Sequence, residues 1–182
     1  MSQTATSVSP ATLRKVISAA SIGNFVEWFD FALYGFLATL LAAHFFPSGD
    51  ATAGLLKTFA VFAVAFAFRP LGGIVFGLLG DRIGRKRTLA LTILIMAGAT
   101  ALIGILPSYA TIGIWAPILL TLIRCAQGFS AGGEIGAATT LLLESASPGR
   151  RGFHVSWQVI SQGGSALLGA GLGALLTRSL SE

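Results

Sequence analysis

A short basic segment at residues 77–88, with the sequence GLLGDRIGRKRT, constrains this chain more than any other feature. It separates two apolar runs, residues 55–79 and 89–106. Each run is close to the length of helix that crosses a hydrocarbon layer of about 30 Å at about 1.5 Å per residue. Charged side chains within lipid cost roughly 2.5–3.5 kcal/mol each on insertion scales, so this segment must lie in water. The sequence therefore predicts a tight turn between two membrane helices.

The composition extends this interpretation to the whole chain. Of its 182 residues, 54% are hydrophobic and 10% are charged, and the mean hydropathy is +0.80. Soluble domains have roughly 25% charged residues, so the sequence predicts an all-α, polytopic membrane helix bundle surrounded by lipid. The net charge of +5 comes mainly from the connecting segments, where it reports topology and does not indicate a nucleic-acid partner.

The apolar runs and the turn residues between them predict five transmembrane helices. They are preceded by a polar tail at residues 1–15 and followed by a short end at residues 179–182. The predicted helices lie at residues 16–43, 55–79, 89–106, 114–143 and 153–177.

The distribution of Lys and Arg predicts the orientation. Eight of these residues lie in the tail and in the loops after the second and fourth helices, whereas only Lys57 and Arg178 lie on the opposite side. The positive-inside rule then predicts a cytoplasmic N-terminus and an external end at residues 179–182.

The first predicted helix carries two acidic residues at membrane depth. At 100° per residue, Gly23, Glu27, Asp30 and Tyr34 share one narrow face, which must contact protein or water. Each carboxylate either pairs with a basic group of a neighbouring helix or binds a proton or a substrate, because ionisable groups within a membrane are costly.

The second predicted helix contains Arg69, followed by Pro70, which favours a kink. Arg69 is either a counter-ion to Glu27 or Asp30, or a ligand for an anionic substrate.

The fourth predicted helix places Arg124, Gln127 and Glu134 on one face. Ten residues separate Arg124 from Glu134, which corresponds to about 15 Å along the helix axis, so the two cannot pair. Each therefore needs a partner from another helix, a proton or a ligand, and a purely structural role for Arg124 stays open. In the fifth helix, Gln158 is a further candidate for the pathway.

Glycines spaced along the helices predict close helix packing. These glycines are Gly73 and Gly77 in the second helix, Gly128, Gly132, Gly133 and Gly136 in the fourth, and Gly164, Gly169 and Gly173 in the fifth.

Enzymatic and metal chemistry find no support in the sequence. The two histidines, His44 and His154, lie near opposite membrane faces, and no phosphate-binding loop is present. We therefore expect no catalytic residue and no metal. The single cysteine, Cys125, excludes an internal disulfide bond.

Several motifs resemble known transporters. The segment at 77–88 resembles the loop between the second and third helices of the major facilitator superfamily. The segments GNFVEWFDF at 23–31, RPLGG at 69–73 and QGFSAGGE at 127–134 resemble its metabolite:proton symporter branch.

This resemblance implies a transporter of twelve helices, of which this chain contains about five, so its partner is a missing C-terminal half. It also implies import of a small carboxylate-bearing solute, either an organic acid or a zwitterionic osmolyte, across the cytoplasmic (inner) membrane. The proton would be the coupling ion, with no other cofactor. A truncated, non-transporting membrane protein or an interaction subunit is the alternative.

The resemblance further implies a conformational gating loop at the cytoplasmic face. Its residues are Gly77, Gly80, Asp81, Arg82, Gly84, Arg85 and Lys86, together with Glu144, Arg150 and Arg151 after the fourth helix.

Overall fold

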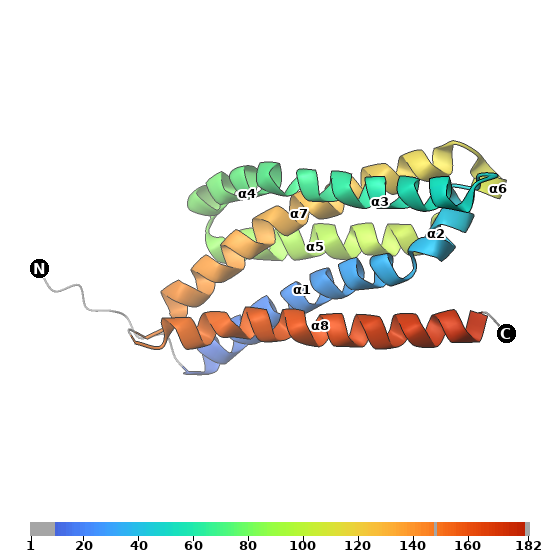
Figure 1. Ribbon diagram of the computed structural model, residues 1–182. Coiled ribbons are helices and arrows are strands. Elements are labelled where there is room, and N and C mark those ends of the chain that lie inside the picture. The colour runs from blue at the N-terminus through green and yellow to red at the C-terminus, as the bar shows by residue number, and fades with distance from the viewer. Residues whose placement is uncertain (1–9, 148, 181–182) are drawn as a thin grey trace, which may run out of the picture.

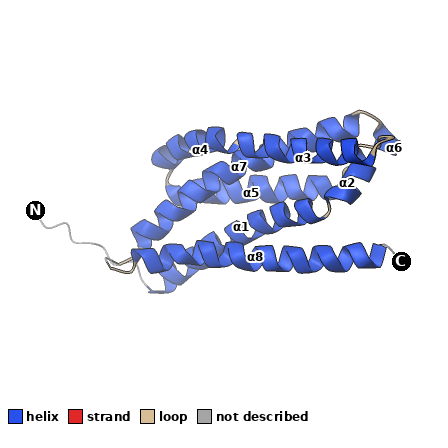
Figure 2. Ribbon diagram, in the orientation of Figure 1, coloured by secondary structure: helices blue, strands red, loops and turns tan. Residues whose placement is uncertain are grey.

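The computed structural model of the chain describes residues 10–147 and 149–180, and all regular structure in these ranges is helical. The helices pack as an elongated bundle (Figure 1), and most of the loops gather at its two ends (Figure 2). In chain order they are α1 (Pro10–Phe36), α2 (Ala38–Phe45), α3 (Ala51–Ala67), α4 (Arg69–Ile83), α5 (Arg85–Gly104), α6 (Tyr109–Ile112), α7 (Trp115–Ser145) and α8 (Arg151–Leu180). The predicted all-α bundle is confirmed.

Within the described ranges, four helical segments are long and apolar enough to cross a membrane. They are Ala11–Phe36, Ala51–Ile83, Arg85–Gly104 and Arg151–Ser179. The remaining predicted span, the fourth, corresponds to α7, which has 31 residues and carries Arg124 and Glu134 in its middle. Such a helix needs its neighbours to shield its polar side chains from lipid.

The helix ends differ from the predicted ones. The first helix begins at Pro10 rather than at residue 16, so residues 10–15 of the predicted tail are helical. The last helix continues to Leu180, so the predicted external end begins inside a helix. Residues 1–9 and 181–182 lie outside the described part of the chain. Apolar periodicity locates the lipid-facing part of a helix, but the helical backbone can continue beyond it into water.

The first two predicted helices are each divided in two. The first is interrupted at Leu37, and the second at Phe68, two residues before Pro70. Proline has no backbone N–H and cannot continue the hydrogen bonds of the preceding turn, so it is accommodated in the first turn of α4. The predicted kink near Pro70 is therefore present as a short break between α3 and α4.

Polarity is inverted relative to a soluble protein. Large apolar side chains cover the outside, where Ile105 and Leu167 are 77% and 78% exposed, whereas Glu27 and Gln127 are fully buried. Water would penalise such an apolar exterior, and lipid does not. The burial pattern therefore supports a multi-pass membrane protein.

The long helix α7 crosses the bundle and contacts α3, α4 and α5 (Figure 1). Gly128 and Gly132 lie against the backbone carbonyl groups of Ala65 and Arg69, and Gly72 of α4 lies against that of Phe129. A Cβ atom at any of these glycines would overlap a carbonyl oxygen, so the close approach requires glycine. This contact fixes Arg69 relative to α7.

Of the other glycines predicted to pack closely, some do and others do not. A Cβ atom at Gly77 or Gly136 would meet open space, so the prediction of close packing at these two positions is wrong. Gly169 and Gly173 do pack closely, since a Cβ atom there would lie 2.8 and 2.6 Å from side-chain carbons of α1. A repeat of small residues identifies candidate contacts, but the rotation of the helix decides which glycines face a neighbour.

Candidate functional site

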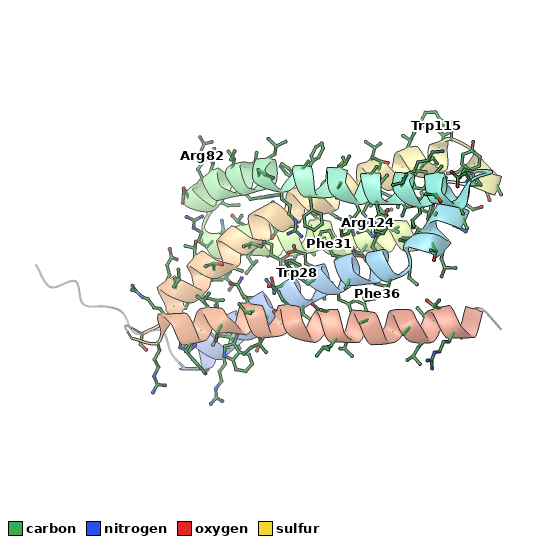
Figure 3. All side chains as sticks on the ribbon, in the orientation of Figure 1. Trp28, Phe31, Phe36, Arg82, Trp115 and Arg124 are labelled. Atoms are coloured by element: carbon green, nitrogen blue, oxygen red, sulfur yellow. The ribbon has the colours of Figure 1, made fainter. Side chains whose placement is uncertain are left out.

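The predicted polar face of α1 points into the bundle. Glu27 is fully buried, Tyr34 is 2% exposed, and the side chain of Asp30 is 13% exposed. Figure 3 shows Trp28, Phe31 and Arg124 near the middle of the bundle, with Arg82 and Trp115 towards its two ends. The helical period places the acids of α1 where they meet α4 and α7.

Glu27 pairs with Arg69 of α4. The Arg69 Nη2 donates a hydrogen bond of 2.7 Å to Glu27 Oε1, and the side chain of Arg69 is 15% exposed. Three aromatic rings surround the guanidinium group, with centroids 5.5 Å (Trp28), 4.5 Å (Phe31) and 4.3 Å (Phe66) from its Cζ atom. The carboxylate neutralises the arginine, and the electron-rich ring faces add cation–π attraction. Two roles were predicted for Arg69, and in this conformation it is the counter-ion of Glu27.

Asp30 pairs with Arg124 of α7. The Arg124 Nη1 donates a hydrogen bond of 2.6 Å to Asp30 Oδ2, and the guanidinium Cζ lies 3.9 Å from the centroid of the Tyr34 ring. The Tyr34 hydroxyl in turn donates to the backbone carbonyl of Thr58, at 3.0 Å. This second ion pair therefore joins α1 to α7 and is linked through Tyr34 to α3.

Gln127 extends this second pair towards α5. Its Nε2 donates to Thr100 Oγ1 at 2.8 Å and lies 3.4 Å from Asp30 Oδ2. The predicted face of Arg124 and Gln127 on α7 is thus directed at Asp30.

Glu134 differs from the other two buried acids. It is 2% exposed, its Oε1 atom has no hydrogen-bond partner, and no ion pair is formed by it within the described residues. Its carboxyl group faces Gly23 of α1, where a Cβ atom would lie 2.5 Å from Oε1. The expectation that Arg124 and Glu134 do not pair with each other is confirmed, since Arg124 binds Asp30.

Gln158 joins α8 to both α7 and α1. Thr139 Oγ1 donates to Gln158 Oε1 at 3.0 Å, and Asn24 Nδ2 donates to the Gln158 carbonyl at 2.9 Å and to Ser161 Oγ at 2.7 Å. Asn24 was not among the predicted site residues. Its position next to Gly23, on a helix that also buries Glu27 and Asp30, was the signal that could have identified it.

The aromatic side chains around Arg69 were also not predicted as site residues. Trp28 and Phe31 lie next to the acids in the sequence, but Phe66 comes from α3 and has no local signal.

Several buried polar atoms near the ion pairs have no hydrogen-bond partner among the described residues, although most buried polar groups in proteins do. These atoms are Glu27 Oε2, Trp28 Nε1, Arg69 Nε, Arg124 Nε, Gln127 Oε1 and Glu134 Oε1.

The predicted gating loop forms a local turn. Gly84 connects α4 to α5 with a φ of 94°, a conformation that favours glycine, and Arg85 Nη2 donates to Asp81 Oδ1 at 2.6 Å. A Cβ atom at Gly80 would lie 2.9 Å from Arg85 Nη1, so Gly80 makes room for this arginine.

The remaining charged groups of the predicted gating loop are exposed. Arg82 and Lys86 lie at the turn, and Glu144, Arg150 and Arg151 lie at the junction of α7 and α8. In the described ranges the structure forms no ion pair between the two loops. Pro148, between these elements, lies outside the described residues.

Comparison with known proteins yields one family and a set of relatives. The family model described as "Sugar (and other) transporter" matches residues 16–181. The chain is 48% identical over 177 residues to the proline/betaine transporter of Salmonella typhimurium, covering 97% of this chain and 35% of that protein. It is 44% identical over 187 residues to the citrate-proton symporter of Klebsiella pneumoniae (98% and 42% covered). It is 50% identical over 163 residues to the shikimate transporter of Escherichia coli (87% and 37% covered).

The chain thus spans between a third and just over two fifths of the length of these curated relatives. No solved structure shows significant similarity to it.

Proposed function

This chain belongs to the sugar (and other) transporter family of the major facilitator superfamily, and from this membership we propose that it is the N-terminal part of a proton-coupled symporter. The solute would be a small metabolite that carries a carboxylate group, imported across the cytoplasmic membrane. Relatives in this family are transporters rather than enzymes. The alternative of a non-transporting membrane protein is not favoured by these matches.

The observation that supports the proposal is the pair of buried ion pairs that join α1 to α4 and α7. In the described part of the chain, Arg69 and Arg124 each keep a buried Nε–H without a partner. A carboxylate is the group that matches a guanidinium group with a free N–H, because it can accept more than one hydrogen bond in one plane.

The same pairs suggest how a proton assists solute binding. A solute carboxylate that binds the guanidinium group would displace Glu27 or Asp30 from it, and a proton taken up by a buried acid would offset the added negative charge. The proton and the solute would thus bind together, and the arginine would return to its acid when both have left.

The names of the relatives agree with this chemistry. Proline, betaine, citrate and shikimate, named in those proteins, all carry a carboxylate group. We therefore propose the carboxylate, and not one particular solute, as the recognised feature.

The proposal also covers the second half of the transporter and the orientation in the membrane. A second helical half would close the solute pathway opposite the ion pairs, as transporters with inverted or repeated halves bind solutes between them. The N-terminus would lie in the cytoplasm, and the exposed Asp81 would hold one conformation by meeting a helix of that second half.

Uptake of radiolabelled proline, betaine and citrate by cells expressing the full-length gene product tests this function. We expect uptake of at least one solute that a proton uncoupler abolishes, and loss of this uptake in Arg69→Gln and Arg124→Gln. Lys57 is exposed in the first half of α3 and belongs to neither ion pair, and Lys57→Gln is the control that should retain uptake. Uptake that is unchanged by the uncoupler would exclude proton symport.

A further inference from the structure

Glu134 is a buried acid that belongs to neither of the two buried ion pairs. Glu27 and Asp30 each meet an arginine, whereas Glu134 forms no ion pair with any residue that the structure describes. An ionised carboxylate without a cation or hydrogen-bond donors is strongly unfavourable in a medium without water, and such a group takes up a proton instead.

The neighbours of Glu134 among the described residues provide no compensating charge. Gly23 of α1 lies against its carboxyl end, the Ile93 side chain of α5 lies next to Gly23, and Phe76 of α4 packs on the adjacent Gly133. The charged group that acts on Glu134 is Glu27, one turn further along α1, which carries the same sign of charge and is itself held by Arg69. On α8, the buried titratable side chain is His154, which is 8% exposed and whose Nδ1 has no hydrogen-bond partner among the described residues.

The position of Glu134 along α7 is equally specific. It lies ten residues, or about 15 Å, after Arg124 towards Ser145, and therefore on the side of the ion pairs where the basic loops gather. The polar contacts of Thr139, Gln158 and Asn24 occupy the same half of the bundle. His154 lies one turn before Gln158 on α8, nearer that end of the bundle.

We propose that Glu134 is the carboxyl group that carries the coupling proton, separately from the two ion-paired acids; this inference rests on the proposed symport function. A hydronium ion on one side transfers a proton to the Glu134 carboxylate, so that one O–H bond of the hydronium ion breaks and one O–H bond of the carboxylic acid forms. The acid O–H bond breaks again when a water molecule on the other side accepts the proton, and nothing is oxidised. Glu27 and Asp30 then serve to hold and release the arginines that bind the solute.

Gly23 is part of this arrangement. Because a Cβ atom would lie 2.5 Å from Oε1, only glycine lets the carboxyl group occupy its place against α1. A methyl group there would push Glu134 away without changing any charge.

The first experiment measures protonation directly. Infrared spectra of the protein in lipid vesicles, recorded across a pH series, should contain the C=O absorption of a protonated carboxylic acid at neutral pH. Glu134→Gln should abolish this absorption, and Gly23→Ala should shift it. Asp50→Asn removes a carboxylate that is exposed at the start of α3, and it should leave the absorption unchanged.

An absorption that persists unchanged in Glu134→Gln would overturn the proposal. Circular dichroism of each variant verifies that the helices are intact, and Gly23→Ala tests the same carboxyl group without replacing it.

The second experiment separates coupling from solute binding in the full-length gene product. Exchange of internal for external solute requires no net proton movement, whereas accumulation does. Glu134→Gln should retain exchange and lose the accumulation that the uncoupler abolishes, whereas Arg124→Gln should lose both. Uncoupler-sensitive accumulation that survives Glu134→Gln would overturn the proposal. Absence of transport by the unmodified protein would contradict the proposed function, while the infrared experiment would still decide whether Glu134 holds a proton.

Discussion

Asp30 and Arg124 are 94 positions apart in the chain, yet their charged atoms lie 2.6 Å from each other inside the bundle. Burying two charges is costly, and their mutual attraction offsets this cost only while both are present. The same holds for Glu27 and Arg69, whose pair is further enclosed by aromatic rings. At the scale of single residues, these acids are therefore tied to particular basic partners, and Glu134 is not.

Removing both members of the Asp30–Arg124 pair should destabilise the protein by less than the sum of the two single removals. We expect Asp30→Asn or Arg124→Gln alone to lower the free energy of unfolding by about 3–5 kcal/mol, because each leaves an uncompensated buried charge. The double variant should lose less than the sum of the two, since no charge is then left unpaired. Unfolding in a denaturing detergent, followed by circular dichroism, measures all three, and strictly additive losses would show that the pair is not coupled.

At the scale of elements, α7 organises the bundle because it contacts α3, α4 and α5. Its glycines allow this where they face a carbonyl group, as Gly132 faces Arg69, and are unnecessary where they face open space, as at Gly136. The close approach of α7 to α4 at Gly132 also sets the position from which Arg69 reaches Glu27. The packing of α7 and the geometry of the Glu27–Arg69 pair are therefore linked.

A matched pair of glycine substitutions tests this link. Gly132→Ala should destabilise the protein by about 1–3 kcal/mol, because its methyl group overlaps the Arg69 carbonyl and must move a backbone. Gly136→Ala, one turn along the same helix, should be neutral or stabilising by up to about 1 kcal/mol, because alanine favours the helix and meets no neighbour. Both values come from the same detergent unfolding assay. Equal effects of the two substitutions would contradict the role assigned to Gly132.

At the scale of the whole molecule, the basic segments at residues 14–15, 82–87 and 150–151 gather at one end of the bundle (Figure 1). The positive-inside rule predicts that this end faces the cytoplasm. The structure also shows which positions can report on this orientation. Thr88 follows the basic turn but is fully buried, so a cysteine there would resist labelling on either side of the membrane.

Single cysteines at exposed positions, in a Cys125→Ala background, test the orientation. We expect cysteines at Ala110 and Ser179 to react with a membrane-impermeant maleimide added to intact cells, and cysteines at Lys86 and Ser147 to react only after the cells are opened. All four should react in detergent, which controls for accessibility. Labelling of Lys86 and Ser147 in intact cells would reverse the assigned orientation.

The sequence by itself determined the features that depend on neighbours along the chain. Apolar length and turn residues predicted the helices, and a period of 3.6 residues placed Glu27, Asp30 and Tyr34 on one face of α1. The cost of charge in lipid predicted that this face points inward, as it does. Helix rise alone excluded a pair between Arg124 and Glu134.

Only the tertiary structure decided which partners meet. Arg69 had two candidate acids on α1 and pairs with Glu27, because the contact of α4 with α7 at Gly132 fixes its position. Local pattern says which way a side chain points from its own helix, but it carries no information on how a second helix is rotated or shifted against the first. For the same reason the sequence could not separate Glu134, which faces Gly23, from the acids that face an arginine.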